Sequence, residues 1–340
     1  MNPPVSIILL NWNGLRYLPA CLAAIHSQTY TDFEVILVDN GSTDGSIAWL
    51  KERFPEVRLI CNEKNRGFAE ANNQAIRTSQ ASYIVTLNND TRVDPGWLAA
   101  LVAAADGSPQ VGMCASKMVF ADRPDMINST GISLDPVGIA WDRRGGEPDD
   151  DCEAEPVEVF GPCAGAALYR RAMLEQIGLF DEDFFAYLED VDLAWRARLA
   201  GWRCLYIPAA RVYHIHSATA IEGSAFKHRL LGRNKVWLIA KNYPLPRLLF
   251  YLPLIVIYDL AAVLFTLVKR QDISSLQGRL EGLRALRRMW RKRRTVQALR
   301  RTSVSRGKPW QYYLSPMVFP WQAPSRYKHL SKKSFDDIPG

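Results

Sequence analysis

YIVTLNNDT, residues 83 to 91, is the stretch from which the fold of this 340-residue chain can be inferred. The run Tyr83 to Leu87 is apolar and β-branched, as expected of a buried strand, and it stops abruptly at Asn88, Asn89 and Asp90, which are poor strand residues. In open α/β sheets, ligands lie at the carboxyl ends of the strands, so Asp90 would meet a metal ion or a phosphate there. The alternative is an Asx-turn that merely ends the strand.

The residues before this stretch alternate between strand and helix patterns. Expected strands are Val5–Leu10, Glu34–Val38 and Val57–Cys61, and expected helices are Leu15–Ser27, Ser46–Phe54 and Phe68–Thr78. Strands separated by helices of this length predict βαβ units and a mainly parallel α/β sheet. Asp39 closes the second strand before a turn rich in Gly and Ser, which is how a carboxylate is presented to a nucleotide at the edge of a sheet.

No glycine-rich phosphate cradle accompanies these strands. The sequence contains neither GxGxxG after the first strand nor GxxxxGK[ST]. The phosphates of a nucleotide must therefore be held in another way. A divalent metal near Asp90, Mg²⁺ or Mn²⁺, is the economical candidate, because Mg²⁺ is commonly held by one or two carboxylates together with substrate phosphate oxygens.

Composition sets the broad class. At 48% apolar and 23% charged residues, the chain is an ordinary globular protein, long enough for one large domain or two. Its six cysteines lack CxxC spacing, so neither a zinc site nor a disulfide framework is indicated and a reducing compartment fits best. The N-terminus lacks the basic region of a signal peptide. We therefore expect the first domain to lie in the cytosol.

The charge is divided unevenly along the chain. From Lys269 to Gly340 there are 18 Lys and Arg against 4 Asp and Glu, a net charge of +14, whereas residues 1–268 have 24 against 31, a net charge of −7. A basic tail on an acidic body points to an anionic surface as partner, either a membrane or a nucleic acid.

A second informative stretch is FFAYLEDVDLAWRARLAGW, residues 184 to 202. Val191, Trp195 and Leu199 recur at four-residue spacing and predict an apolar helix face, with Gly201 as the C-terminal cap. Glu189 and Asp190 would then lie in the first turn, at the positive end of the helix dipole. Two carboxylates there can simply cap the helix, or one can be held ionised as a base.

Four segments, in this order, resemble the signatures of the inverting glycosyltransferases of family 2, which have the GT-A fold. They are VSIILLNWNG (5–14), VDNGSTDG (38–45), NRGFAEANN (65–73) and LNNDT (87–91). The Asn-Asn-Asp form is most similar to the rhamnosyltransferase-like bacterial branch, which builds O-antigen and related surface glycans. The resemblance runs from about Val5 to Asn242. It implies transfer of a hexose, such as rhamnose, from a dTDP- or UDP-sugar to a lipid-linked saccharide or a growing surface glycan.

The resemblance also implies a donor site. Asp90 would bind the metal, although Asn88 stands where many relatives have the first carboxylate, so one acidic ligand remains in this motif. Asp39 would contact the nucleotide base. The other residues expected to line the donor pocket are Asn65, Gly67, Asn72 and Asn89. For Asn72 and its neighbour Asn73, the alternative is a polar helix face.

The resemblance further places the chemistry on Asp190 as catalytic base, with Glu189 as a supporting or acceptor-binding carboxylate. Asp192 is the fallback and would point to another side of the helix. In the segment VYHIHSAT (212–219), His214 would be a third metal ligand or phosphate contact, ahead of His216. Arg233 would either reach the diphosphate or have only a surface role.

The C-terminal part predicts membrane association. Leu248–Val268 has a single charge, Asp259, and is long enough to span a bilayer. A single crossing would put the +14 tail outside and contradict the positive-inside tendency, so an in-plane or re-entrant segment at the cytoplasmic face of the plasma membrane is preferred. A basic amphipathic helix follows, a pattern typical of helices on anionic lipid, and we expect its basic cluster Arg291–Arg294 to meet the lipid. Its apolar stripe comprises Leu276, Leu280, Leu283, Leu286 and Met289 or Trp290.

The expected organisation is a GT-A domain at 1–242, membrane-associated helices at 243–305 and a basic tail at 306–340. Met126–Glu158, which contains Asp149, Asp150 and Asp151, is predicted to be a long, exposed, solvated loop.

Two other functions compete with glycosyl transfer. A nucleotidyltransferase would explain neither Glu189 and Asp190 nor the tail. A nucleic-acid-binding protein would not explain the apolar segment, and the tail has no recognisable nucleic-acid motif, so we expect no nucleic acid as partner.

Overall fold

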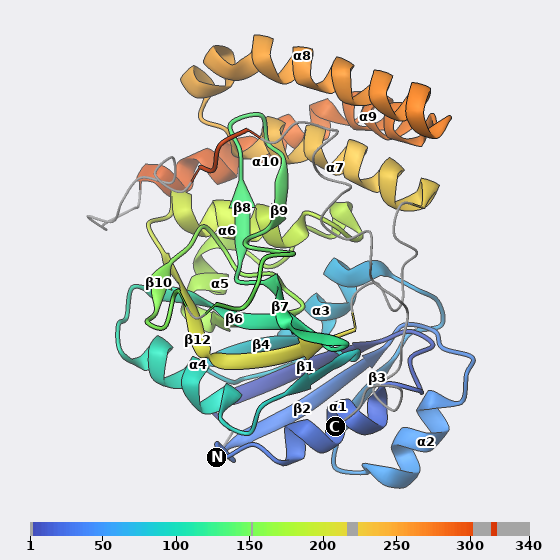
Figure 1. The fold of residues 1–340 in the computed structure, drawn as a ribbon, viewed down its shortest axis with the longest axis vertical. Helices are drawn as coiled ribbons and strands as arrows, with labels where there is room; N and C mark the ends of the chain where they lie inside the picture. The colour runs from blue at the N-terminus through green and yellow to red at the C-terminus, as the bar shows by residue number, and fades with distance from the viewer. Residues whose placement is uncertain (1–2, 151, 216–223, 302–313, 318–340) are drawn as a thin grey trace.

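The structure is a computed structural model that describes residues 3–150, 152–215, 224–301 and 314–317. A mixed, mainly parallel sheet has helices on both faces, and helices α7 to α10 lie beyond one of these faces (Figure 1). The predicted α/β architecture is therefore confirmed. His216, Asp151 and most of the predicted tail at 306–340 lie outside the described residues.

The N-terminal part is a series of βαβ units. Its elements are β1 (Val5–Asn11), α1 (Leu18–His26), β2 (Phe33–Asp39), α2 (Ser46–Arg53), β3 (Arg58–Cys61), α3 (Gly67–Thr78) and β4 (Tyr83–Asn88). The strands pair in parallel in the order β4-β1-β2-β3. All of their carboxyl ends therefore lie at one edge of the sheet, as the alternating pattern predicts.

The second part of the chain extends this sheet beyond β4. Its elements are β5 (Thr91–Val93), α4 (Trp97–Asp106), β6 (Val111–Phe120), β7 (Arg123–Ser129), β8 (Ile132–Leu134), β9 (Ala140–Asp142), β10 (Val157–Glu158), β11 (Ala166–Arg170), α5 (Arg171–Ile177), the 3-10 helix η1 (Glu182–Phe184), α6 (Glu189–Leu199) and β12 (Arg203–His214). Strand β11 runs antiparallel between β4 and β6, and β12 runs parallel to β6. Strand β5 pairs with β12 so that Thr91 faces His214, which brings the end of β12 beside Asp90.

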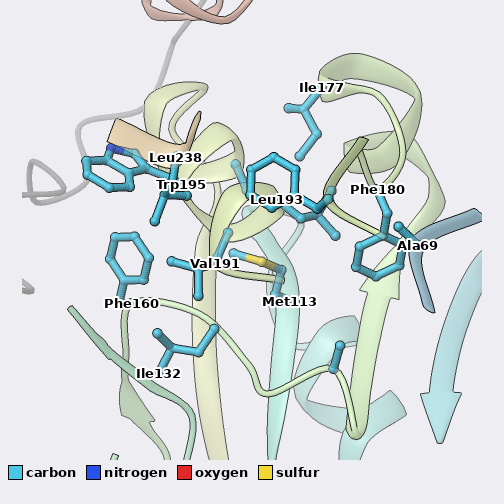
Figure 2. Close-up of a cluster of buried hydrophobic side chains, with 14 of the residues drawn as sticks. Ala69, Met113, Ile132, Phe160, Ile177, Phe180, Val191, Leu193, Trp195 and Leu238 are labelled. Atoms are coloured by element: carbon cyan, nitrogen blue, oxygen red, sulfur yellow. The ribbon is translucent and has the colours of Figure 1, made fainter. Parts of the chain in front are cut away.

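Alternate side chains of the strands form a core on each face of the sheet. Ile7 and Leu9 of β1 belong to the cluster that contains α1 and α4, whereas Ile8 belongs to the cluster that contains α3, α5 and α6. In the latter, Trp195 of α6 meets Phe160 edge to face, with ring centroids 6.0 Å apart. Figure 2 shows this cluster, into which the predicted apolar face of α6 projects.

The segment 126–158 is not the solvated loop expected from its composition. Ile127, Ile132 and Leu134 are buried, and β8 and β9 form a hairpin. The Asp149 side chain is 7% exposed and lies 2.5 Å from Lys117 Nζ and 2.8 Å from Arg211 Nη1. The expectation failed because Asp149 pairs with cations on distant strands, and this pairing offsets the cost of burying its charge. No local sequence pattern reveals such a pairing.

The C-terminal helices form a layer over α6. They are α7 (Ala225–Asn242), α8 (Leu245–Arg270), α9 (Ser274–Arg284) and α10 (Leu286–Ala298), followed by the 3-10 helix η2 (Leu299–Arg301). Helices α7 and α9 pack closely because α9 presents glycines, and a Cβ on Gly278 would overlap with the carbonyl oxygen of Arg229. Asp259 of α8 accepts from Lys235 Nζ of α7 (2.7 Å) and from Arg279 Nη2 of α9 (2.9 Å). These two ion pairs tie α8 to α7 and α9.

Helix α8 is nonetheless mostly exposed. Among the described residues, Leu245–Lys269 is the one helical stretch long and apolar enough to cross a bilayer, and little of its apolar part is buried. Its outer face presents large apolar side chains to solvent. The most exposed are Leu249, Phe250, Ile257, Leu260, Leu264 and Val268.

The basic cluster of α10 is divided between solvent and protein. Lys292 pairs with Asp181 and Asp183, and Arg293 is buried and donates from Nη1 to the carbonyl oxygen of Ala240 at 2.9 Å. The expectation that all of Arg291–Arg294 faces lipid is therefore wrong. Only Arg291 and Arg294 of these four are exposed, because the other two positions of the helix face the protein.

Candidate active site

The carboxyl ends of β1, β2 and β4 carry a chain of linked polar side chains. Asn11 Nδ2 donates to Asp39 Oδ2 (2.8 Å), and Asn89 Nδ2 donates to Asn11 Oδ1 (2.7 Å). Asp39 Oδ1 accepts from the backbone N–H of Gly41 (3.1 Å) and Ser42 (2.8 Å). Asp39 is fully buried and both of its oxygens have partners within the protein, so any contact with a nucleotide base would come in addition to these bonds.

Asn65, Gly67 and Asn72 lie around the first turn of α3. Asn65 Oδ1 accepts from the N–H of Gly67 (2.8 Å), which has φ of +82°, and a Cβ on Gly67 would lie 2.5 Å from the carbonyl oxygen of Phe185. Glycine is therefore required there for both conformation and space. Asn72 is buried and donates to Phe68 O of its own helix (2.9 Å). The structure thus brings this region against the segment that precedes α6.

Asp90 and His214 lie next to each other at the sheet edge. His214 Nε2 is 3.3 Å from Asp90 Oδ1, and His214 Nδ1 is 2.8 Å from Asn128 Oδ1. Burial alone would lower the pKa of His214, but the Asp90 carboxylate raises it above the usual value for histidine. The two side chains that the sequence predicts as metal ligands are therefore adjacent.

This pair fits a divalent cation. If Nδ1–H donates to Asn128, the lone pair of Nε2 faces the Asp90 carboxylate, an arrangement that is stable only with a proton or a cation between the two acceptors. Among the residues that the structure describes, no group of three His, Cys, Asp or Glu side chains gathers for metal binding. The described residues would therefore supply two ligands, Asp90 and His214, with phosphate oxygens of the substrate and water as further ligands.

Glu189 and Asp190 begin α6, as predicted, but their environments differ. Asp190 is partly exposed; its Oδ2 accepts from the N–H of Ala164 (3.2 Å) and its Oδ1 from that of Val191 (2.8 Å). Burial raises the pKa of Asp190 to about 6, against the effect of these two N–H groups. Glu189 is 6% exposed, and its Oε2 has no hydrogen-bond partner. Burial, then the Asp190 charge, raises the pKa of Glu189 well above the usual value.

Asp192 is separated from Asp190 by its partners. It is fully buried, and it accepts from Arg196 Nε (2.9 Å), Lys241 Nζ (2.8 Å) and Asn242 Nδ2 (2.8 Å). The expectation that Asp192 points to another side of the helix is confirmed. With its acceptor sites occupied inside the protein, Asp192 joins α6 to α7.

Arg233 faces the protein and not the sheet edge. Its Nη2 donates to Phe184 O (2.9 Å), its Nε donates to Asn234 Oδ1 (3.0 Å), and its guanidinium lies 4.4 Å from the centre of the Trp237 ring. In this arrangement Arg233 holds the backbone that leads into α6. Arg233 lies on α7, a helix that the sequence analysis did not connect with Asp190.

Two residues of the segment 126–158 were missed by the sequence interpretation. Asn128 of β7 holds His214, as described above. Asp142 ends β9. Burial is the main cause that raises the pKa of Asp190 and Cys163, and the Asp142 charge raises both further. The apolar residues Met126 and Ile127, directly before Asn128, were a signal for a buried strand, but the surrounding charges obscured it.

Comparison with known proteins gives consistent matches. The family model described as glycosyl transferase family 2 matches residues 6–178. The N-acetylglucosaminyl-diphospho-decaprenol L-rhamnosyltransferase of Mycobacterium tuberculosis is 30% identical over an alignment that covers 63% of this chain and 76% of that protein.

Two solved structures share the fold. The mannosyltransferase PcManGT from Pyrobaculum calidifontis, in complex with GDP-Man and Mn²⁺, has a TM-score of 0.52 and 19% identity over 91% of this chain and 89% of its own. GalNAc-T7 with UDP, GalNAc and Mn²⁺ has a TM-score of 0.54 and 16% identity over 71% of this chain and 50% of its own. The expected GT-A fold is confirmed by these matches.

Proposed function

This chain belongs to glycosyl transferase family 2, an inverting family, and from that membership we propose that it transfers rhamnose or another hexose from a dTDP- or UDP-sugar to a lipid-linked saccharide or a growing surface glycan. The observation that carries the proposal is the position of Asp190, partly exposed in the first turn of α6 and with a pKa of about 6. A carboxylate with such a pKa is mostly ionised at neutral pH, yet basic enough to accept a proton.

In the proposed reaction Asp190 takes the proton from the acceptor hydroxyl as that oxygen attacks the anomeric carbon of the donor. The backbone N–H groups of Ala164 and Val191 orient the carboxylate. Burial raises the pKa of Glu189 well above its usual value and so disfavours a second negative charge beside the base. Inversion follows because the acceptor oxygen approaches the face opposite the leaving diphosphate.

The donor would lie over the carboxyl ends of β1, β2 and β4. The turn after Asp39, together with Asn65, Gly67, Asn72 and Asn89, would border the nucleoside. Asp90 and His214 would hold Mg²⁺ or Mn²⁺, and the ion when bound would supply positive charge that stabilises the leaving diphosphate.

The acceptor side would be a membrane surface. Helix α8 exposes its apolar outer face, and Arg291 and Arg294 of α10 expose positive charge. We place the protein on the cytoplasmic face of the plasma membrane, with α8 in the plane of the anionic leaflet or re-entrant in it. This position would bring Asp190 to the level at which a lipid-linked saccharide presents its hydroxyl group.

The test begins with a thermal-shift screen of dTDP- and UDP-sugars with Mn²⁺ or Mg²⁺, which selects the donor. With that donor, Asp190→Asn should bind with unchanged affinity by calorimetry but turn over at least ~100-fold more slowly, the low end for loss of a general base. Asp192→Asn, two residues away in the same helix, is the control and should keep its turnover per folded molecule. If the order of the two losses is reversed, Asp190 is not the base.

A further inference from the structure

The backbone that leads into Asp190 has an unusual conformation. Between η1 and α6, the non-glycine residues Phe185, Tyr187 and Leu188 have φ values of +66°, +67° and +67°. Residues with a Cβ rarely adopt such left-handed values, and they keep them only where the surroundings enforce them. We call residues 183–188 the base loop, because it ends directly before Glu189 and Asp190.

Asn234 of α7 binds the base loop at several points. Its side chain is fully buried, and Nδ2 lies 3.0 Å from Phe184 O, 2.9 Å from Ala186 O and 2.7 Å from Tyr187 O. Its two amide hydrogens are thus shared among three carbonyl groups of the loop. At its other end, Asn234 Oδ1 accepts from Arg233 Nε (3.0 Å), whose Nη2 also binds Phe184 O.

The base loop is held from the opposite side as well. Phe185 O accepts from the N–H of Phe68 (2.6 Å) and Ala69 (3.2 Å), two of the N–H groups that the first turn of α3 leaves without intrahelical partners. The loop thus bridges α3, on the donor side, and α7, on the C-terminal side. Its last residue, Leu188, accepts from Asp192 N (2.9 Å) and so begins α6.

We propose that Asn234 is a positioning residue for the catalytic base: by binding three carbonyl groups of the base loop, it fixes where α6 begins and hence where the Asp190 carboxylate lies relative to the bound donor. The inference rests on the proposed function, since it takes Asp190 to be the base. It assigns to α7 a role in the chemistry, although no side chain of this helix needs to touch the substrate.

The first test replaces Asn234 by alanine and measures three quantities on the folded enzyme. Turnover should fall at least 10-fold, the affinity for the selected donor with Mn²⁺ should stay unchanged by calorimetry, and the acid limb of the pH profile should move, because the environment of Asp190 changes. Asn242→Ala is the matched control. Asn242 lies on the same helix and is equally buried, but it binds Asp192 and not the base loop, so this variant should lose stability with little change in turnover per folded molecule.

The decisive measurement is a double-mutant cycle with Asp190→Asn. If Asn234 acts by positioning the base, Asn234→Ala should have little further effect on turnover once Asp190 has been replaced. If Asn234→Ala does not fold, Arg233→Gln removes the guanidinium contact with Phe184 O and should show a smaller loss that also disappears in the Asp190→Asn background.

Two results would overturn the inference. One is wild-type turnover and pH profile in Asn234→Ala, or in Arg233→Gln where that variant replaces it. The other is an equal loss with and without Asp190, which indicates a purely structural effect. Failure of the proposed function looks different, because Asp190→Asn would then keep its turnover whatever Asn234 does.

Discussion

Asp190 and Glu189 are neighbours in sequence, yet the protein treats their charges in opposite ways. Asp190 receives two backbone N–H groups, which favour its ionised form, whereas Glu189 Oε2 is buried without a partner. A carboxyl group in such a place is stable mainly when protonated. The surroundings therefore favour a negative charge on Asp190, the residue that solvent can reach, over one on Glu189.

The first prediction is an acid limb in the rate profile. Because Asp190 must be ionised to accept a proton and has a pKa of about 6, kcat/KM for the acceptor should be level above pH 7 and fall about tenfold per unit below pH 6. Of the neighbouring charges, that of Asp142 acts in the same direction as burial and raises the pKa of Asp190 further. A limb near pH 4 would show an unperturbed carboxylate and contradict this account.

The second prediction concerns Glu189→Gln. Glutamine has nearly the shape of a protonated glutamate, so this variant should keep its stability and most of its turnover, whereas Asp190→Asn should lose at least ~100-fold in turnover. Turnover with the donor selected by thermal shift, together with the melting temperature, checks both statements. Equal loss in the two variants would mean that the charge of Glu189 takes part in the reaction.

At the scale of elements, α6 begins with the proposed catalytic base and continues into the hydrophobic core. Val191, Trp195 and Leu199 pack into the core, and Asp192 joins Arg196 and Lys241 inside it. Burial alone would raise the pKa of Asp192, but the charges of Lys241 and Arg196 lower it. Removing Asp192 is costly because Arg196 would lose its carboxylate inside the protein, whereas Lys241 would keep Asp181.

The third prediction follows from this network. Asp192→Asn should lower the free energy of unfolding by about 3 kcal/mol at pH 7. Since a lowered pKa stabilises the folded state only above the unfolded value of 3.8, the deficit should be the same at pH 5 and shrink below about pH 4. Urea unfolding at several pH values measures it. The control is Asp190→Asn. Because the pKa of Asp190 is raised in the folded protein, removing its charge should cost no comparable stability. An equal loss of stability in both variants would argue against the network.

The elements that could be predicted from sequence are those that local patterns determine. The strands ending at Asp39 and Asn88 and the first turn of α6 were predicted because apolar runs and end signals lie within a few residues of each other. Short strands in a charged segment were missed: burial of Asp149 depends on Lys117 and Arg211, which lie far away in sequence. The same limitation hid Asn234, since only the folded chain shows that α7 contacts the base loop.

At the scale of the molecule, the position of α8 depends on Asp259. Its carboxylate pairs with Lys235 of α7 and Arg279 of α9, and the Lys235 side chain is only 4% exposed. If α8 left this layer to cross a bilayer, it would carry Asp259 into lipid at about 2.5 to 3.5 kcal/mol and leave Lys235 buried without its partner. An in-plane position avoids both costs and still covers the apolar outer face.

The last prediction tests this placement. Replacing Ile257, Leu260 and Leu264 by glutamine should abolish binding to vesicles that contain phosphatidylglycerol, because each side chain gains about 1.5 to 3 kcal/mol when it is buried in lipid. Turnover of a short water-soluble acceptor should be unchanged, since all three side chains are at least 60% exposed and point away from the protein. Replacing Arg291 and Arg294 by glutamine should weaken vesicle binding only at low salt, by about 1 kcal/mol per residue.

Thiol labelling then separates lying on the membrane from crossing it. In a background without the exposed Cys61 and Cys152, a reporter cysteine is placed at Gln271, just after α8, or at Lys51 on α2. If α8 lies in the plane, an impermeant reagent reaches both positions from the same side of sealed vesicles. Labelling of the two positions from opposite sides would show that α8 crosses. The pairing of Asp259 with Lys235 and Arg279 would then have to break in the membrane-bound protein, so that Asp259→Ala should strengthen vesicle binding.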